Sequence, residues 1–490
     1  MEGLKGRVIL PSIIGSNMVL QQQKPIKIWG KAKTKSEILV EIFKKDDNCA
    51  IRTGLSTVDG ENNFEVELMS MEASLLQYTI KITGEEVVVL EDVMVGEVWL
   101  TSGQSNMQLN LQYIIDGQKY MDEATNPNIR IFYQDHIPAE EGKCDAGFSY
   151  TPMFDVYNGF WEKANSASNI ASCSGIGYTF GLDLYEKLKT LGQETPIAII
   201  NSSTGSSSIH TWISRETAEN TVKVKEFLLK KNRLKIESDW NGEKECKFNQ
   251  VSVLYNHKIA PLINLYMRGV LWYQGENDVG EEDYQEYYRA AMGALIKQWG
   301  SDKVFILCQL APFEYQCSPN ALPGIRECFV DVCKEFPETT AVIPIHDIDL
   351  TWDYGTFGYK HPIHPLTKLP VGKRMAQVAM ALAYGEDREY NLPPVYESMK
   401  IIDNRILIRF KNVGSGLKIK EGNSQVKGFE ISGGERMFRP AKAIIIGKNT
   451  VELSNEEVAL PVFASYGFIA MNNFINLFNS MDLPALPFRT

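Results

Sequence analysis

Residues 95–107 read VGEVWLTSGQSNM, and this stretch decides the fold class of the chain. It opens with a compact apolar run and passes through a Ser-Gly turn, after which Met107, Leu111 and Ile114 recur at the spacing of one helix face. A short apolar run is typical of a strand buried on both faces, and the periodicity after it indicates a helix. The stretch therefore predicts one strand–turn–helix unit of an α/β fold.

The same alternation continues through the middle of the chain. Compact apolar runs recur at 196–200, 269–272, 304–310 and 340–345. Stretches with helical periodicity lie at 180–191, 283–299 and 371–384. Strands that alternate with helices predict a parallel sheet covered on both faces, and such sheets bind ligands beyond the carboxyl ends of their strands.

Both flanks of this region are β-like. The first 94 residues contain short strands in which apolar and polar residues alternate, and similar runs return after residue 386. We therefore predict an N-terminal β-sandwich-type domain at 1–94, a central α/β domain at 95–386 and a C-terminal β domain at 387–490. Residues 215–250 are charged and partly helical, which indicates a solvated insertion, with a lid over a ligand site as the alternative.

The composition limits the classes of function. The 490 residues include 61 acidic and 50 basic side chains, for a formal net charge of −11. This balance argues against a nucleic acid partner, because such proteins neutralise phosphates with Lys and Arg. The apolar runs are shorter than the roughly 18–20 residues of a membrane-spanning helix, and the first residues lack the apolar core of a secretory signal. We therefore expect a cytoplasmic globular protein, whose oligomeric state the sequence does not indicate.

Ser105 is the first candidate for chemistry. It stands where the predicted strand turns into a helix, so its hydroxyl is expected to be exposed beside helix-terminal N–H groups that can stabilise an oxyanion. A serine at this position is also common as an ordinary helix N-cap, and spacing alone favours that interpretation.

Three further polar clusters fall where a strand should end or a helix begin. They are NSSTGSSS at 201–208, QGEND at 274–278 and HPIHP at 361–365. His364 suits the role of a base that takes a proton from a serine and returns it near neutral pH. No Cys or carboxylate cluster stands at ligand spacing beside His361 and His364, so we predict no metal site.

Taken in order, the four clusters resemble the blocks of SGNH-type hydrolases, in the branch of sialate O-acetylesterases and related carbohydrate esterases. The matching segments are GQSNM at 103–107, Gly205, GEND at 275–278 and IHP at 363–365. Segments at both ends, 17–21 and 483–490, also resemble the family, so the likeness covers nearly the whole chain.

The resemblance implies a three-layer α/β/α core of the flavodoxin-like type. It also implies a serine esterase, without a cofactor, that removes O-acetyl groups from sugars, most typically from O-acetylated sialic acids. Ser105 would attack the acetyl carbonyl after His364 takes its proton. The oxyanion would be held by the backbone N–H groups of Ser105 and Gly205 and by the Asn277 side chain.

The sequence departs from the family at the acid that orients the catalytic histidine. Relatives often carry Asp three or two residues before that histidine, where this chain has His361 and Pro362. The orienting group is therefore left open between Glu276 and Asp353, about level, with Asp349 or a Ser–His dyad behind them.

The sugar pocket is the second departure. Thr204 and Ser206 replace a Trp and a Gly of the family, and His210 stands where relatives carry Glu. The residues expected at the substrate are Gln104, Asn106, Tyr273, Gln274 and His210. Because the pocket differs, acetylxylan or another acetylated carbohydrate is an alternative to sialic acid. An inactive carbohydrate-binding protein is a further alternative, although such a protein needs no nucleophile–base pair.

Overall fold

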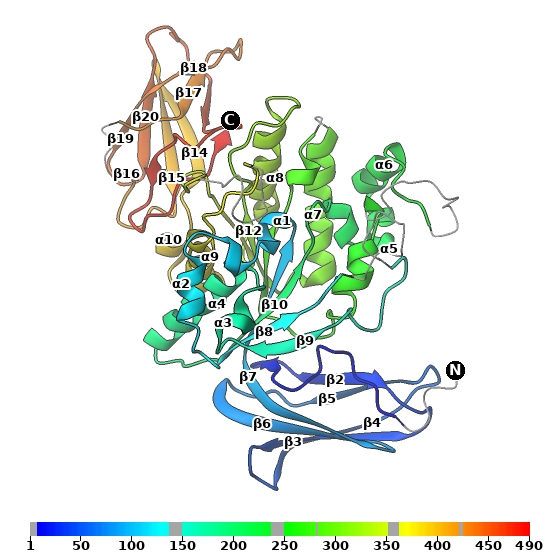
Figure 1. The fold of residues 1–490 in the computed structure, drawn as a ribbon. Helices are drawn as coiled ribbons and strands as arrows, with labels where there is room; N and C mark the ends of the chain where they lie inside the picture. The colour runs from blue at the N-terminus through cyan, green and yellow to red at the C-terminus, as the bar shows by residue number, and fades with distance from the viewer. Residues whose placement is uncertain (1–6, 137–148, 237–248, 281–282, 351–361, 421–424) are drawn as a thin grey trace. The chain divides into compact units, whose positions relative to one another are not determined.

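The computed structural model of the chain describes residues 7–136, 149–236, 249–280, 283–350, 362–420 and 425–490 (Figure 1). The chain divides into two compact units, Met1–Val270 and Leu271–Thr490.

The first unit begins with antiparallel β structure, as the alternating pattern predicted. Its strands are β1 (Val19–Gln21), β2 (Ile26–Lys31), β3 (Glu37–Lys44), β4 (Ala50–Thr57), β5 (Asn63–Leu68), β6 (Ser74–Thr83) and β7 (Val87–Gly103). β3 pairs with β4 and β6, β6 pairs with β7, and β2 pairs with β5. Every second side chain of β3 is buried, which is the pattern of a sheet with one face on a core.

Strand β7 connects this β structure to the α/β part of the same unit. Its first half pairs with β6, and its second half pairs in parallel with β10 (Ile197–Ser203). The two strands approach so closely that a Cβ on Gly96 would lie 2.0 Å from the carbonyl oxygen of Pro196. The predicted boundary between residues 94 and 95 falls inside this strand, because one continuous strand serves both sheets.

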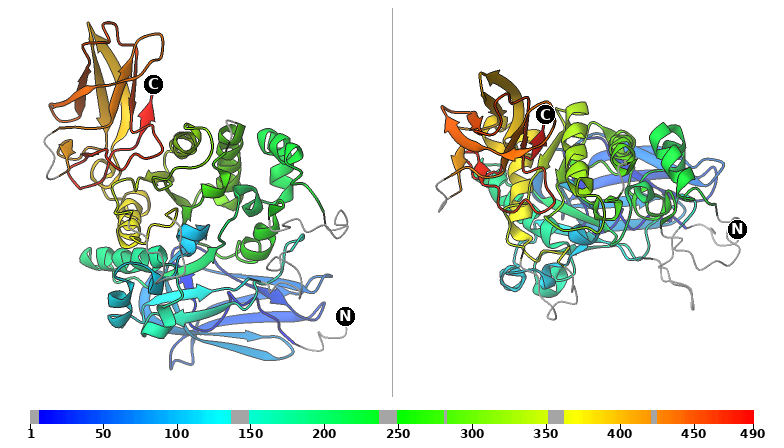
Figure 2. Two further views of the ribbon diagram at one scale, coloured as in Figure 1. Left: turned by 45° about the horizontal axis from the view of Figure 1, so that its top comes forward. Right: turned by 90° about the horizontal axis from the view of Figure 1, so that it is seen from above.

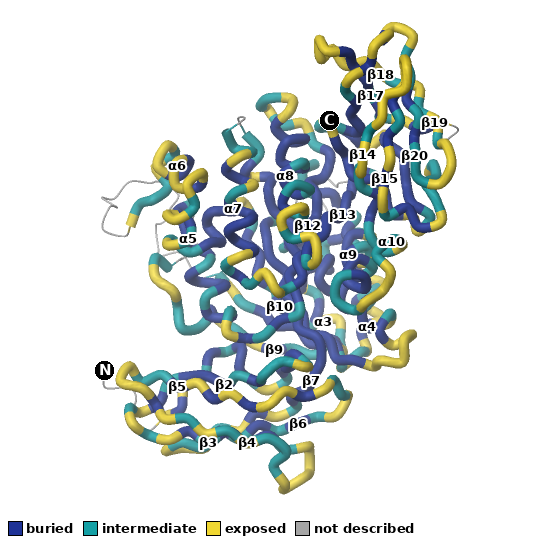
Figure 3. Tube along the Cα trace, turned by 180° about the vertical axis from the view of Figure 1, so that it is seen from behind, coloured by how far each residue is buried: buried dark blue, intermediate teal, exposed yellow. Residues whose placement is uncertain are grey.

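Parallel strands form the α/β part of the first unit. β10 lies between β7 and β8 (Ile129–Tyr133), and β9 (Phe160–Lys163) pairs antiparallel with β8 at the edge. The helices are α1 (Ser105–Gln108), α2 (Gly117–Asp122), α3 (Ala167–Ile170), α4 (Gly175–Thr190), α5 (Arg215–Asn220) and α6 (Val222–Lys230). The last two belong to the charged segment 215–250, of which residues 237–248 lie outside the described part. Figure 3 shows β10 buried along most of its length, whereas α6 is partly exposed.

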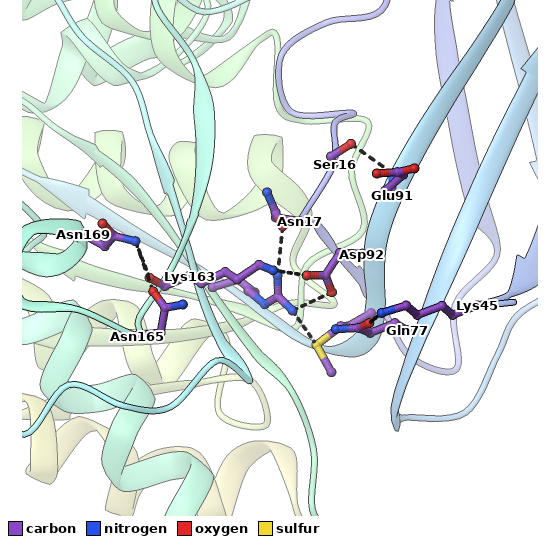
Figure 4. Close-up of polar contacts among 11 residues, drawn as sticks. Ser16, Asn17, Lys45, Gln77, Glu91, Asp92, Lys163, Asn165 and Asn169 are labelled. Atoms are coloured by element: carbon purple, nitrogen blue, oxygen red, sulfur yellow. Dashed lines mark hydrogen bonds and ion pairs between the residues drawn. The ribbon is translucent and has the colours of Figure 1, made fainter.

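A buried ionic network joins the two parts of the first unit (Figure 4). Arg130 on β8 is 1% exposed and donates to Asp92 on β7 at 2.9 Å. Lys163 on β9 pairs with the other carboxylate oxygen of Asp92, and Arg130 also donates to the Asn17 side chain at 3.4 Å. Burial raises the pKa of Asp92, but the two cations outweigh it and hold that pKa below its ordinary value of 3.8.

The second unit also begins with parallel strands. β12 (Val304–Cys308) lies between β11 (Gly269–Tyr273) and β13 (Thr340–Ile343) and pairs in parallel with β13. The helices are α7 (Asp283–Gly300), α8 (Ala321–Glu335), α9 (Leu369–Ala383) and α10 (Arg388–Asn391). α8 packs on α7 and on β13, and α9 packs on β12 and β13. The predicted apolar runs and helices of the middle of the chain are thus confirmed.

Antiparallel sheets complete the second unit, as the β-like runs predicted (Figure 2). One consists of β14 (Val395–Ile402), β15 (Arg405–Lys411), β20 (Thr450–Ser454) and β19 (Lys442–Ile446). Another consists of β18 (Arg439–Pro440), β17 (Phe429–Ser432), β21 (Phe463–Tyr466) and β23 (Phe488–Arg489). Phe410, Phe429 and Phe488 lie in their shared core. The buried guanidinium of Arg326 on α8 donates to the carbonyls of Ile469 and Ala470, which ties these sheets to the α/β part of the unit.

None of the helices in the described residues combines the length and hydropathy that crossing a membrane requires. Nor do three or more His, Cys, Asp or Glu side chains gather there in the manner of metal ligands.

Candidate active site

Ser105 lies at the carboxyl end of β7, where the sequence predicted it. β7 ends at Gly103, whose φ of 132° favours glycine, and α1 begins at Ser105. Gln104 occupies the N-cap position in an extended conformation and makes no side-chain cap hydrogen bond. The alternative interpretation of Ser105 as an ordinary N-cap is therefore wrong. Ser105 is the first residue of a short helix and is half-buried.

Gly205 lies beside Ser105 in the same unit. The parallel register aligns Ser203 with Gly103, and the N–H of Thr204 donates to the Gly103 carbonyl at 3.0 Å. A Cβ placed on Gly205 would lie 3.6 Å from the Ser105 Cβ. Two sequence blocks that are about 100 positions apart thus meet at one edge of the sheet, as expected for the ends of parallel strands.

Gln108 is a residue that the sequence reasoning missed. Its Oε1 accepts a hydrogen bond from the backbone N–H of Gly205 at 2.8 Å, the same N–H that we expected to hold an oxyanion. The side-chain amide of Gln108 must turn its oxygen toward Gly205, because a backbone N–H can bond only to an acceptor. The available signal was position, since Gln108 stands one helical turn after Ser105 and faces the same side.

The other expected pocket residues of the first unit are buried. Gln104 and Asn106 are 4% and 1% exposed. His210 lies in a 3₁₀ turn, Ile209–Trp212, and its Nε2 is 2.7 Å from the carbonyl oxygen of Asn249, so this nitrogen carries the proton. Burial lowers the pKa of His210 to about 4, and the imidazole is therefore neutral at physiological pH.

The third block forms a turn at the carboxyl end of β11 in the second unit. Gln274 donates to the Asp278 carboxylate at 2.6 Å, and Tyr288 of α7 donates to the Gln274 carbonyl at 2.8 Å. Within the 3₁₀ turn Glu276–Asp278, Glu276 and Asp278 are buried and Asn277 between them is exposed. Asn277 is therefore the accessible residue of this turn.

A buried lysine, also unforeseen, lies close to this turn. Lys368 is 1% exposed, and its Nζ lies 5.3 Å from the centre of the Tyr273 ring, which is a cation–π distance. Burial lowers the pKa of Lys368 to about 8, while the thiol of Cys308 and the Glu276 carboxylate act in the opposite direction. Glu276 therefore lies within electrostatic range of a buried cation.

The histidine block lies in the turn before α9. His364 is half-buried, five residues before that helix begins. Asp353 and His361 lie outside the described residues. Asp349 is exposed after β13, and Asp347, two residues earlier, is engaged by Arg374 at 2.9 Å.

Residues 95–313 match the family model described as "Carbohydrate esterase, sialic acid-specific acetylesterase", and this segment contains Ser105, Gly205 and the turn at Glu276–Asp278. The segment belongs to this family of carbohydrate esterases. The chain is accordingly a carboxylic ester hydrolase, and the enzyme class and the mixed α/β fold expected from the sequence are confirmed.

Relatives extend the likeness beyond the matched segment. The chain is 28% identical to a sialate O-acetylesterase of Rattus norvegicus over 470 residues, which cover 86% of this chain and 81% of the relative. It is 25% identical to the sialate O-acetylesterase of Homo sapiens over 458 residues, 86% and 79% of the two chains. A crystal structure of a carbohydrate acetylesterase from Xanthomonas citri shares 27% identity and a TM-score of 0.80 over 99% of each chain. The predicted domain boundaries and the roles of the site residues stay predictions.

Proposed function

We propose that this carbohydrate esterase removes O-acetyl groups from sialic acids by two-step acyl transfer through an acetyl-Ser105. The observation that carries the mechanism is the position of Gly205, whose Cβ site lies 3.6 Å from the Ser105 Cβ. A serine beside a glycine N–H at the end of a parallel sheet can attack a carbonyl while that N–H binds the developing oxyanion. The sialate O-acetylesterases to which the chain is similar support the choice of substrate.

The steps follow the usual order for a serine esterase. His364 takes the proton of Ser105, and Oγ attacks the acetyl carbonyl. The oxyanion is held by the backbone N–H groups of Ser105 and Gly205 and by the Asn277 side chain, each donor lowering the barrier by roughly 3–4 kcal/mol. His364 then gives this proton to the departing sugar oxygen, which leaves as a hydroxyl group, and water releases acetate from the acyl-enzyme.

Glu276 and Asp353 are proposed as the two candidates for the acid that orients His364; Glu276 is buried in the turn after β11, and Asp353 lies outside the described residues. Replacing the true orienting acid by its amide should lower kcat by about 10²-fold or more, because the imidazole loses its preferred tautomer. We would therefore compare Glu276→Gln and Asp353→Asn. Near-normal rates in both variants would point to Asp349 or to a Ser–His dyad.

The mechanism is tested by hydrolysis of a chromogenic acetate ester. Ser105→Ala should lose at least about 10³-fold in kcat. Ser102→Ala is the matched control, because Ser102 lies three positions earlier near the end of β7, is fully buried and has no side-chain hydrogen bond among the described residues. Full activity in Ser105→Ala would refute the mechanism, and loss in both variants would point to damage at the strand instead.

A second substrate class deserves the same test. The chain is also similar to a carbohydrate acetylesterase from Xanthomonas citri, which keeps another acetylated carbohydrate, such as acetylxylan, as the second candidate. Acetate release should be compared between 9-O-acetylated sialic acid and acetylated xylo-oligosaccharides. A clear preference for the xylan fragments would overturn the sialate proposal and leave the esterase mechanism intact.

A further inference from the structure

Lys258 is a buried cation at the end of β10 for which the proposed mechanism has no role. It lies in a π-helical turn, Tyr255–Ile259, and is 2% exposed. Its Nζ donates to the backbone carbonyl of Ser203 at 3.3 Å. Ser203 is the last residue of β10 and stands two positions before Gly205, so the ammonium acts on the chain that presents the Gly205 N–H.

A second hydrogen bond completes the link between the turn and the strand. The Ser202 hydroxyl donates to the carbonyl of Lys258 at 3.3 Å. The π-helical turn and the end of β10 are therefore joined in both directions. Such turns are rare and are found often at functional sites, because the extra residue displaces side chains from regular helical positions.

The charged ammonium of Lys258 destabilises the fold in these electrostatic surroundings. Among the described residues, its ammonium forms no ion pair, and the Ser203 carbonyl is its one hydrogen-bond acceptor. The titratable groups that face it are Asp135, which is exposed just after β8, and two basic groups, His136 and His257. Burial lowers the pKa of Lys258 to about 7, and Asp135 acts in the opposite direction. A buried charge without a paired carboxylate destabilises a fold, so packing gives no reason for a lysine here.

We propose that Lys258 is a positioning residue of the esterase, whose ammonium holds the Ser203 carbonyl and so aims the Gly205 N–H at the acetyl oxygen. This inference rests on the proposed function, which assigns the oxyanion role to Gly205. Lys258 does not act as a base for Ser203, because its Nζ contacts the carbonyl of that residue, and the Ser203 hydroxyl has no partner among the described residues.

The test compares Lys258→Met with the wild type on a chromogenic acetate ester. Methionine keeps the length of the side chain and removes the charge and the donors. We expect kcat to fall about 10- to 100-fold while KM changes less than about threefold, because the oxyanion forms only after substrate binds. Ser202→Ala is the matched control, since it removes the other bond between the turn and the strand and leaves the ammonium in place.

The pH profile separates positioning from a merely structural role. In the wild type, kcat should decline as the pH rises through about 7, where Lys258 loses its proton. This decline should be absent in Lys258→Met and should move above pH 9 in Lys258→Arg, whose guanidinium stays charged. Urea unfolding should find Lys258→Met at least as stable as the wild type below pH 7, because a buried charge has been removed.

Three results would overturn the inference. One is a wild-type kcat in Lys258→Met from pH 5 to 9, and another is an alkaline decline that stays in place in Lys258→Arg. The third is a loss of kcat that only follows a loss of folded protein in Lys258→Met. If Lys258→Met does not fold, the pH profile of Lys258→Arg tests the inference alone: a decline in kcat that moves above pH 9 supports it, and a decline that stays near pH 7 overturns it. Failure of the proposed function would look different, since Ser105→Ala would then keep its activity.

Discussion

Replacing Gln108 by alanine should raise the kcat/KM of the esterase. In the structure, Gln108 Oε1 accepts the Gly205 N–H at 2.8 Å and thereby occupies a donor that the transition state needs. An acetyl oxygen must displace this amide oxygen before the N–H can hold it. The side chain lies on α1, one turn after Ser105, and a Cβ on Gly205 would be 3.3 Å from Oε1, so the amide fills the space beside the nucleophile.

The size of the effect follows from the strength of one neutral hydrogen bond. Such a bond contributes about 0.5–1.5 kcal/mol net, because water competes for both partners. Removing the competitor should therefore raise kcat/KM about 2- to 10-fold. Gln108→Glu should act in the opposite direction, since a charge-assisted bond is roughly twice as strong. Its kcat/KM should fall below wild type at neutral pH, and its ratio to the wild-type value at the same pH should recover as the carboxylate is protonated in acid.

The assay is the initial rate of a chromogenic acetate ester at concentrations well below KM, which reports kcat/KM directly. Gln112→Ala is the control, because Gln112 lies on the next helical turn, Leu111–Tyr113, and its side chain forms no hydrogen bond among the described residues. The control should keep the wild-type value. A tenfold or greater fall in Gln108→Ala with a normal control would refute this reasoning and make Gln108 part of the catalytic machinery.

Two further predictions concern stability in the first unit. Asp92→Asn leaves Arg130 buried without its carboxylate and should lower the free energy of unfolding by about 3–5 kcal/mol at pH 7 in urea titrations. The folded pKa of Asp92 lies below its ordinary 3.8, so its contribution to stability is present above pH 3.8 and is lost as the pH falls through the folded value. The difference in the free energy of unfolding between Asp92→Asn and the wild type should therefore narrow in acid. A difference that stays constant with pH would contradict this reasoning. Gly96→Ala sets a Cβ 2.0 Å from the Pro196 carbonyl oxygen and should prevent soluble expression, whereas Gly434→Ala, with open space around it, should express normally. Equal yields of the two alanine variants would show that the strands can separate.

The sequence was most informative where a local pattern determines local structure. The stretch at 95–107 predicted a strand, a turn and a helix, and the structure has β7 ending at Gly103 and α1 beginning at Ser105. The helix predicted at 180–191 begins earlier, at Gly175, because Ser174 caps it through the Gly177 N–H and because its glycines pack against Ile199. Those glycines carry no hydrophobic signal, so periodicity could not find the first turn.

Strands without a clear pattern were missed for a related reason. β8, Ile129–Tyr133, has a buried arginine at its second position, which interrupts the apolar run. Arg130 is tolerated there because Asp92, 38 positions away, supplies its carboxylate. A partner so distant in the sequence leaves no trace in a local window.

The sequence by itself indicated the alternation of strands and helices in the middle of the chain and placed Ser105, Gly205 and the turn around Asn277 at strand ends. It could do so because hydrophobic periodicity and turn residues act over a few positions. Only the tertiary structure decided which polar groups meet. Gln108 reaches the Gly205 N–H across 97 positions, and Lys258 reaches the Ser203 carbonyl across 55. Such contacts depend on the register of parallel strands and on burial, and both are properties of the packed chain as a whole.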